Sequence, residues 1–201
     1  MTDRSWKPAS LRTLTWMLLS IILLVAFFLR TYELNRFPAG PFGDEAASAI
    51  LASEVATGRS LPLFITAYTG HEVLFYYLSA PVMWLMGTGV VALRMTSALV
   101  GVMTVLVAYL LARELFDPLG ASDTDEFAIE SRLLGLLTAT LMATSFWHIS
   151  VSRYGYRAIT LPLMQSLMLW ALWKGLRTSN WKWLAAADRC PLRASRLIQL
   201  A

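Results

Sequence analysis

Uncharged apolar runs alternate with short polar segments along this chain. The first run covers residues 13–29, and four more follow at 73–93, 95–112, 133–152 and 158–173. Each run is close to the roughly 20 residues that a helix needs to cross the hydrocarbon core of a bilayer. None shows the two-residue alternation of the strands in a membrane barrel. The pattern therefore predicts an all-α, multi-pass membrane protein with about five transmembrane helices.

The composition agrees with a membrane protein. Hydrophobic residues make up 57% of the chain and charged residues 15%, whereas soluble domains contain about 25% charged residues. The formal net charge of +4 comes from basic residues scattered between the apolar runs. A nucleic-acid-binding surface would instead cluster them, so we expect no nucleic-acid partner. The single cysteine, Cys190, excludes an internal disulfide and a cysteine-based metal cluster.

The basic residues in segment 1–12 predict the orientation of the chain. They place the amino terminus in the cytoplasm and the loop 30–72 on the outer face of the cytoplasmic membrane. No small-residue cleavage site follows the first run, so we expect an uncleaved helix. If all five runs span the membrane, the acidic segment 113–132 lies outside. This agrees with the positive-inside rule, by which basic residues collect on the cytoplasmic side. The basic carboxyl end would then also lie outside, which conflicts with the positive-inside rule. Either one run does not span the membrane, or the tail 178–201 is not natural.

The loop 30–72 contains one segment with helical character. Residues 44–57 combine an apolar and a polar side, and Gly58 follows as a stop signal. We expect a short amphipathic helix that lies along the outer membrane surface. Asp44 falls where this helix begins, as an N-cap, and Glu45 lies in its first turn, where the helix dipole favours a carboxylate. A capping carboxylate can also face a substrate.

A second polar cluster opens the run at 73–93. His71 and Glu72 precede Tyr76 and Tyr77, all on the outer side that carries Asp44 in this topology. The residues are consistent either with an interfacial aromatic belt or with a functional site. Together with Asp44, His71 and Glu72 offer hard ligands, so a divalent cation is left open as a cofactor, although no metal site is assigned.

Isolated arginines stand at the ends of the later runs. Arg153 and Arg157 are four residues apart and could form a fork for a phosphate, or they could be cations that extend to the interface from helix ends. The alternation of spans places both on the cytoplasmic side, away from Asp44. Arg94, between two runs, is expected to be a loop cation.

Five segments together resemble the amino-terminal part of bacterial GT-C glycosyltransferases, in the branch that is similar to protein O-mannosyltransferases and aminoarabinose transferases. They are GDEA at 43–46, GHEVLFYYL at 70–78, ALRMTSALVG at 92–101, YLLARELF at 109–116 and SRYGYR at 152–157. The likeness extends over roughly residues 11–177 and rests on the order and spacing of the segments. It departs at Val73, where many relatives have proline.

The resemblance implies transfer of a sugar from a polyprenyl-phosphate-linked donor to an acceptor at the outer membrane face. A carboxylate then takes the proton of the acceptor as it attacks the sugar. By resemblance Asp44 is this base, and Glu45 and Glu72 orient the acceptor or the base, with His71 beside them. Tyr76 and Tyr77 would line the sugar site. Arg153 or Arg157 would stabilise the departing lipid phosphate.

The resemblance also divides the chain into a glycosyltransferase-like module at 13–177 and a tail at 178–201. Within the tail, residues 187–196 have neither helical apolar periodicity nor family likeness, which indicates a truncated or frameshifted end, and relatives are several hundred residues long. A missing carboxy-terminal part or a partner subunit, besides membrane lipids, would then complete the site. The alternative is a non-catalytic membrane subunit, in which small residues such as Gly101 and Gly135 pack helices together. A transporter would need charged or broken sites inside the helices, which Pro81 and Pro162 hardly supply.

Overall fold

A computed structural model describes residues 8–65, 72–117 and 126–188. The described part contains eight α-helices and a short 3₁₀-helix, so the predicted all-α class is confirmed. The helices are α1 (Pro8–Thr31), α2 (Gly43–Ala56), α3 (Leu74–Met86), α4 (Val90–Phe116), α5 (Glu126–Thr144), α6 (Phe146–Arg153), α7 (Thr160–Thr178) and α8 (Trp181–Asp188), with the 3₁₀-helix η2 (Arg157–Ile159) before α7.

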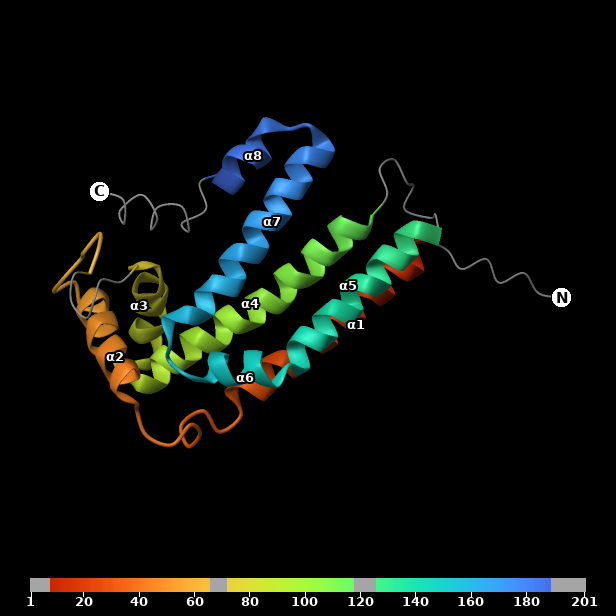
Figure 1. Ribbon diagram of the computed structural model, residues 1–201. Coiled ribbons are helices and arrows are strands. Elements are labelled where there is room, and N and C mark those ends of the chain that lie inside the picture. Colours follow the sequence, from red (N-terminus) through yellow and green to blue (C-terminus); the bar gives the residue numbers. More distant parts are fainter. Residues whose placement is uncertain (1–7, 66–71, 118–125, 189–201) are drawn as a thin grey trace.

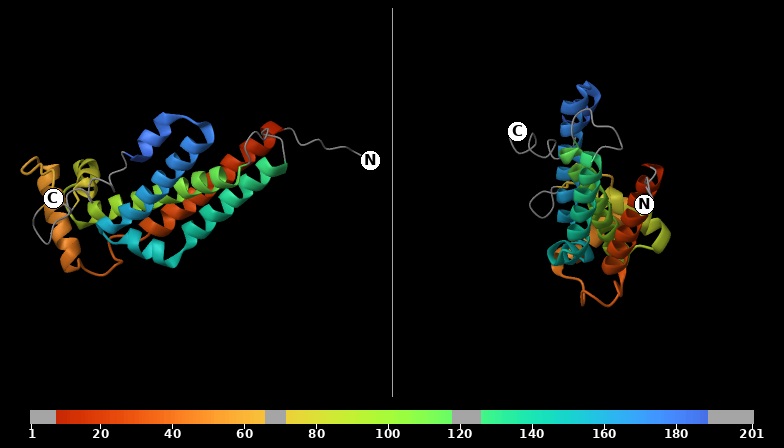
Figure 2. Two further views of the ribbon diagram at one scale, coloured as in Figure 1. Left: turned by 45° about the horizontal axis from the view of Figure 1, so that its top comes forward. Right: turned by 90° about the vertical axis from the view of Figure 1, so that its right-hand side faces the viewer.

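The long helices form an elongated bundle around α4. Helices α1 and α5 pack on one side of α4 and α7 on another, while α2, α3 and α6 gather at one end (Figure 1). Figure 2 shows the same bundle from two further directions, with α2 across its end. One apolar core lies between α2, α3, α4 and α7, and a second lies between α1, α4 and α5. We call the end with α2 and α6 the α2 end, and the end where α1 and α5 begin the opposite end.

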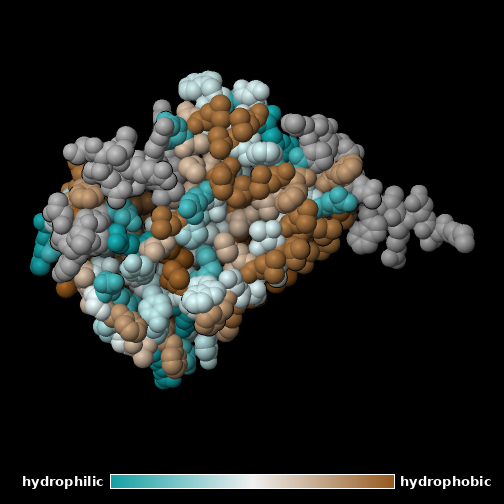
Figure 3. Space-filling model, in the orientation of Figure 1, coloured by the Kyte–Doolittle hydropathy of each residue, from teal (hydrophilic) through white to brown (hydrophobic). Residues whose placement is uncertain are grey.

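Three of the described helices are long and apolar enough to cross a membrane. These segments are Leu11–Thr31, Val90–Phe116 and Phe127–Thr144, in α1, α4 and α5. Large apolar side chains on α1 and α5 face outward, among them Leu24 at 67% and Leu141 at 63% exposure. Figure 3 shows the resulting hydrophobic band along α5. Such a continuous apolar surface is typical of contact with lipid, and a membrane protein is the interpretation that these helices support.

The helix boundaries correct the predicted runs in three places. The run 73–93 is broken at Gly87, whose φ of +88° ends α3 after 13 residues. That is too short to cross a bilayer, which takes about 20 residues. The run 95–112 lies inside α4, and Arg94 belongs to this helix rather than to a loop. The run 133–152 divides at Ser145, whose extended backbone separates α5 from α6.

These breaks change the direction of the chain. Because α3 does not traverse the bundle, α4 begins at the α2 end, where α1 finishes (Figure 1). Helix α5 then returns to the α2 end, and α7 leaves it again. The alternation that placed Arg153 and Arg157 far from Asp44 is therefore wrong, and both arginines lie at the end that carries Asp44.

Two arginines satisfy the open carbonyl groups at the ends of neighbouring helices. Arg30, at the end of α1, donates to the carbonyls of Met142 and Ala143 at 3.2 and 3.1 Å, in the last turn of α5. Arg153, at the end of α6, donates to the carbonyls of Leu29 and Tyr32 at 2.9 and 2.7 Å, at the end of α1. The last carbonyls of a helix lack partners within the helix and carry partial negative charge, so a guanidinium stabilises them.

The first residues of the expected tail form part of the fold. Residues 181–188 make α8, whose Trp183 packs edge-on against Trp170 of α7 with ring centroids 5.4 Å apart. Lys174 lies over both rings, at 4.9 and 4.6 Å from their centroids. Residues 181–188 at the start of the tail thus form a helix that packs on α7, and residues 189–201 lie outside the described residues.

Close packing between α4 and α6 requires a glycine at position 101. A Cβ atom added to Gly101 would lie 2.7 Å from the Cβ of Ser152 and 3.1 Å from Nε of Arg30. Gly135 similarly accommodates the ring of Tyr109, with a Cβ position 3.0 Å from its carbon atoms. The small residues thus pack helices within the chain.

Replacement of Gly101 by leucine should push α6 away from α4. Overpacking of this kind costs about 1–3 kcal/mol, which for a chain of this size lowers the melting temperature by roughly 3–10 °C. The matched control is Gly89→Leu, because a Cβ at Gly89 meets nothing within 4 Å. Melting of both variants in detergent checks the packing, and equal melting temperatures for the two variants would contradict it.

Candidate functional site

Asp44 and Glu45 are neighbours in the first turn of α2 and have opposite environments. The Asp44 side chain is exposed, whereas Glu45 is 3% exposed and points into the bundle. The N-cap of α2 is Phe42, and it makes no side-chain capping bond, so the predicted N-cap role of Asp44 is wrong. Both carboxylates lie in the first turn, where the helix dipole favours negative charge.

Glu45 forms a buried, bidentate ion pair with Arg94 of α4. The Arg94 Nε atom donates to Oε1 of Glu45 at 2.7 Å, and Nη2 donates to Oε2 at 2.9 Å. The remaining donors reach the carbonyls of Leu34, Pro38 and Gly40 at 3.2, 2.8 and 2.8 Å. All five N–H groups of the guanidinium are thereby used. Arg94 thus fastens α2 and the loop 34–40 to the beginning of α4.

The segment after α6 completes the surroundings of Glu45. The backbone N–H of Gly155 donates to Oε1 of Glu45 at 3.0 Å, and the Tyr154 ring meets Phe42 edge-on at 5.6 Å between centroids. Burial alone would raise the pKa of the Glu45 carboxyl. The hydrogen bonds from Arg94 and Gly155, together with the charge of Arg94, outweigh burial and hold this pKa below its ordinary value. Arg94 and Gly155 therefore hold Glu45 in place and favour its ionised form.

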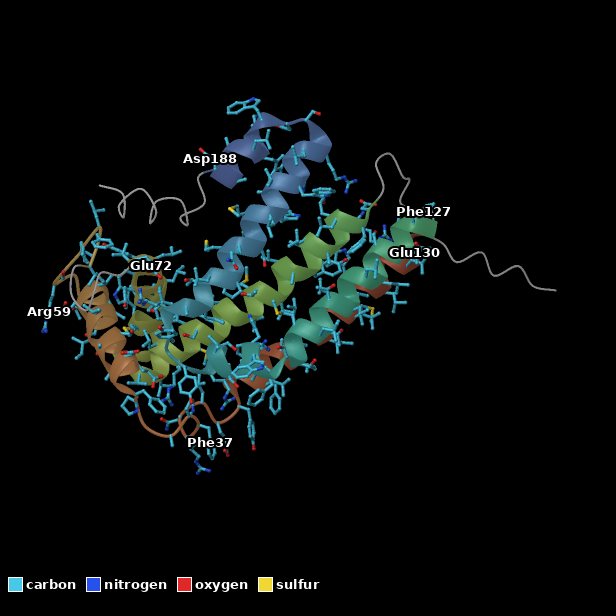
Figure 4. All side chains as sticks on the ribbon, in the orientation of Figure 1. Phe37, Arg59, Glu72, Phe127, Glu130 and Asp188 are labelled. Carbon is cyan, nitrogen blue, oxygen red and sulfur yellow. The ribbon has the colours of Figure 1, made fainter. Side chains whose placement is uncertain are left out.

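Tyr76, Glu72 and Arg157 lie near one another beside α2. Ser48 lies one turn after Asp44, so the two share a helix face. Ser48 is buried and lies near the hydroxyl of Tyr76, which is buried on α3. Glu72, just before α3, accepts a bond from Nη1 of Arg157 at 2.9 Å. The side-chain view shows Glu72 at the α2 end of the bundle (Figure 4).

The other predicted site residues do not all join this group. Tyr77 points toward the loop after α2, where its hydroxyl donates to the carbonyl of Pro62 at 3.1 Å. Arg153 is occupied by carbonyls at the end of α1 and by that of Phe37 at 3.0 Å. His71 lies outside the described residues. The structure therefore places Tyr76, Glu72 and Arg157 near one another, with Asp44 at the same end of the bundle, whereas Tyr77 and Arg153 are bonded to backbone carbonyls.

The most important residue that the sequence prediction missed is Arg94. Its signal was present, because one charge inside an otherwise apolar stretch of 90–112 demands a buried partner. A second such residue is His148, which lies within the predicted apolar run 133–152. Its Nδ1 accepts a bond from Arg30 at 2.8 Å. Burial, and then the charge of Arg30, lower the pKa of His148 to about 4, so the ring is neutral at pH 7.

A metal site does not emerge from the part of the chain that the structure describes. Within residues 8–65, 72–117 and 126–188, no three His, Cys, Asp or Glu side chains are arranged to hold an ion. The proposed ligand set of Asp44, His71 and Glu72 includes a residue outside these ranges, and Glu72 is paired with Arg157. The divalent cation stays a prediction that this geometry does not test.

Comparison of the chain with known protein-family models, with curated proteins and with solved structures finds no match. Function is therefore inferred from the residues and from the geometry of the α2 end.

The lowered pKa of Glu45 predicts how stability depends on pH. Its contribution is complete above the pKa of an unfolded glutamate, about 4.3, and is lost as the pH falls through the lower pKa of the folded state. Unfolding free energies of the wild type and Glu45→Gln, measured from about pH 7 to pH 3, should therefore converge toward the acid end.

The control for this titration is Glu33→Gln. The ion pair of Glu33 with Arg36 is exposed and 3.5 Å long, so its removal should leave the wild-type pH profile in place. A constant difference between the wild type and Glu45→Gln at all pH values would contradict an ionised, stabilising Glu45.

Proposed function

We propose that this chain carries the catalytic end of a membrane glycosyltransferase of the GT-C type, with Asp44 as the general base. The observation that carries the proposal is the contrast between two adjacent carboxylates. Glu45 is immobilised by Arg94 and Gly155, and Asp44 on the same helix turn is left exposed. An exposed carboxylate on a fixed backbone is available to a bound acceptor, and positioning of this kind supplies much of catalysis.

The chemistry needs a base and a group that accepts developing negative charge. When an acceptor hydroxyl attacks the anomeric carbon of the sugar, Asp44 takes its proton, the bond from sugar to lipid phosphate breaks, and the phosphate leaves with the bonding electrons. Arg157 is the cation that supports the departing phosphate in this scheme. Arg157 contacts Glu72 through one of its five donors. If a phosphate took the place of Glu72 as its partner, the positive charge of Arg157 would stay compensated.

The direction of the helices supports a multi-pass arrangement in the cytoplasmic membrane with the α2 end outside. Helices α1, α4, α5 and α7 run alternately toward and away from the α2 end. This order places Arg12, Arg113, Arg132 and Arg177 at the opposite end, which becomes the cytoplasmic side. The positive-inside rule counts basic residues and gives acidic residues little weight. With α3 removed from the count, and with α7 taken as a fourth span beside the three candidate spans in α1, α4 and α5, the basic carboxyl end falls on the cytoplasmic side.

A non-catalytic membrane subunit is the second candidate, and one observation favours it. Glu45, Glu72 and Arg153 are all held by bonds within the chain. In that case the α2 end would be a closed polar cap, and Asp44 would be an ordinary exposed carboxylate. The apolar faces of α1 and α5 would then pack against partner helices.

Asp44→Asn separates the two candidates. If Asp44 is the base, the rate of sugar transfer from a polyprenyl-phosphate donor should fall by about 10²- to 10⁴-fold, with unchanged melting and membrane insertion because the side chain is exposed. Glu54→Gln, near the other end of the same helix, is the matched control and should keep wild-type transfer. Full transfer by Asp44→Asn in an active protein would remove Asp44 as base, and absence of any transfer by the wild type would favour the subunit.

A further inference from the structure

Arg30 and His148 form a contact between α1 and α6 that lies outside the proposed catalytic group. Nη2 of Arg30 lies 2.8 Å from Nδ1 of His148. A guanidinium has donors and no acceptor, so Nδ1 accepts this bond with its lone pair. The hydrogen of the neutral ring is then on Nε2, which is buried and has no partner within the part of the chain that the structure describes. The bond therefore requires a neutral His148 with one particular tautomer.

The surrounding helices fix Arg30, and Arg30 fixes the imidazole ring. The arginine is fully buried. It also donates to three backbone carbonyls, those of Ala26, Met142 and Ala143, at 3.0, 3.2 and 3.1 Å. Because Nε2 of the ring has no partner in the described ranges, the hydrogen bond that orients the ring is the one from Arg30. Loss of the Nδ1 lone pair would therefore free the ring and leave the arginine in place.

The neighbouring helices bring no carboxylate to this ring. Helix α6 packs against α1, α4, α5 and η2, and the described residues of α1, α6 and η2 include no acid. The acids of α4 and α5 are Glu114, Glu126 and Glu130, in the last turn of α4 and the first turns of α5, at the opposite end of the bundle. Glu33, just after α1, is exposed and paired with Arg36. A positive charge on the ring would therefore have no nearby carboxylate from these helices or from Glu33.

The other arginines at this end have partners of their own. Arg94 and Arg157 are paired with carboxylates, and Arg153 of α6 donates to carbonyls at the end of α1. The charge that acts on the ring is that of Arg30. Together with burial, this charge holds the pKa of His148 at about 4, which agrees with the geometry of the bond.

We propose that the bond from Arg30 to His148 is an acid-sensitive latch that holds α6 against the end of α1. A proton on Nδ1 removes the acceptor and places a second cation beside a buried guanidinium, so the protonated ring must move away. Helix α6 carries Arg153 and is followed by Gly155, whose N–H donates to Glu45. Opening of the latch would thus loosen the support of α2. The latch does not depend on sugar transfer.

The orientation of the bundle exposes this latch to acid from one side. His148 is partly exposed, so a proton can reach the ring without unfolding of the bundle. In the proposed orientation the α2 end lies outside the cytoplasmic membrane, and the pH of the external medium would then set the state of α6. Two-state elements that respond to protonation of a histidine are a common form of pH sensor.

The amides of α6 should exchange with solvent more readily as the pH falls. The pKa of the ring is about 4 in the closed form and about 6.5 when the ring is free, so between these values the open form binds more protons. Exchange of α6 should therefore be about tenfold or more faster at about pH 5 than at about pH 7, after correction for the intrinsic rate at each pH. Hydrogen exchange of the purified full chain in detergent, followed by mass spectrometry, measures this change.

Two variants separate a titrating latch from a contact that is only structural. The amide oxygen of His148→Asn can accept the bond from Arg30 and does not titrate, so α6 should exchange slowly at both pH values. His148→Leu has no acceptor, so exchange should be fast at both. Segment 102–112 of α4 reports global unfolding and should not respond to pH in any of the three proteins. Exchange of α6 that is independent of pH in the wild type, or that rises equally in His148→Asn, would overturn the proposal.

Discussion

The bond between Glu45 and Arg94 is the constraint on which the rest of the α2 end depends. Burial of two opposite charges is costly, and an ion pair repays the cost only when its geometry and remaining hydrogen bonds are complete. Here all five donors of Arg94 are used, and Glu45 also accepts from Gly155. Four separate segments are thereby joined: α2, the loop 34–40, the beginning of α4 and the segment after α6. The position of Asp44, one residue before Glu45, follows from this junction.

Around that junction, arginines at helix ends donate to the free carbonyl groups of neighbouring helices. Arg30 serves the end of α5, and Arg153 serves the end of α1. The α2 end therefore binds its cations internally, through carbonyls and carboxylates. At the opposite end, Arg177 of α7 also pairs with carboxylates, those of Glu114 and Asp117. The α2 end differs in the exposed Asp44 carboxylate, which the bonds of Glu45 leave on a rigid support.

The sequence predicts the helical class and the α2 helix closely, since 44–57 was expected and Gly43–Ala56 is found. The sequence does not predict that α3 ends at Gly87 or that Ser145 separates α5 from α6, because no charged residue marks either position within its apolar run. The first break depends on a positive φ, and at the second the last carbonyls of α5 are satisfied by Arg30, far away in sequence. The ion pair of Glu45 is not predicted from the sequence either. Its partner Arg94 is 49 residues distant, and only the fold brings the two together.

A double-mutant cycle on the purified full chain tests the central claim most directly, with Glu45→Gln, Arg94→Met and their combination. Loss of either partner leaves an unpaired buried group and should cost about 3–5 kcal/mol of unfolding free energy. The double variant should lose clearly less than the sum of the singles, with a coupling free energy of about 2 kcal/mol or more at pH 7. Additive losses, or single variants as stable as the wild type, would show that the pair does not hold α2 in place.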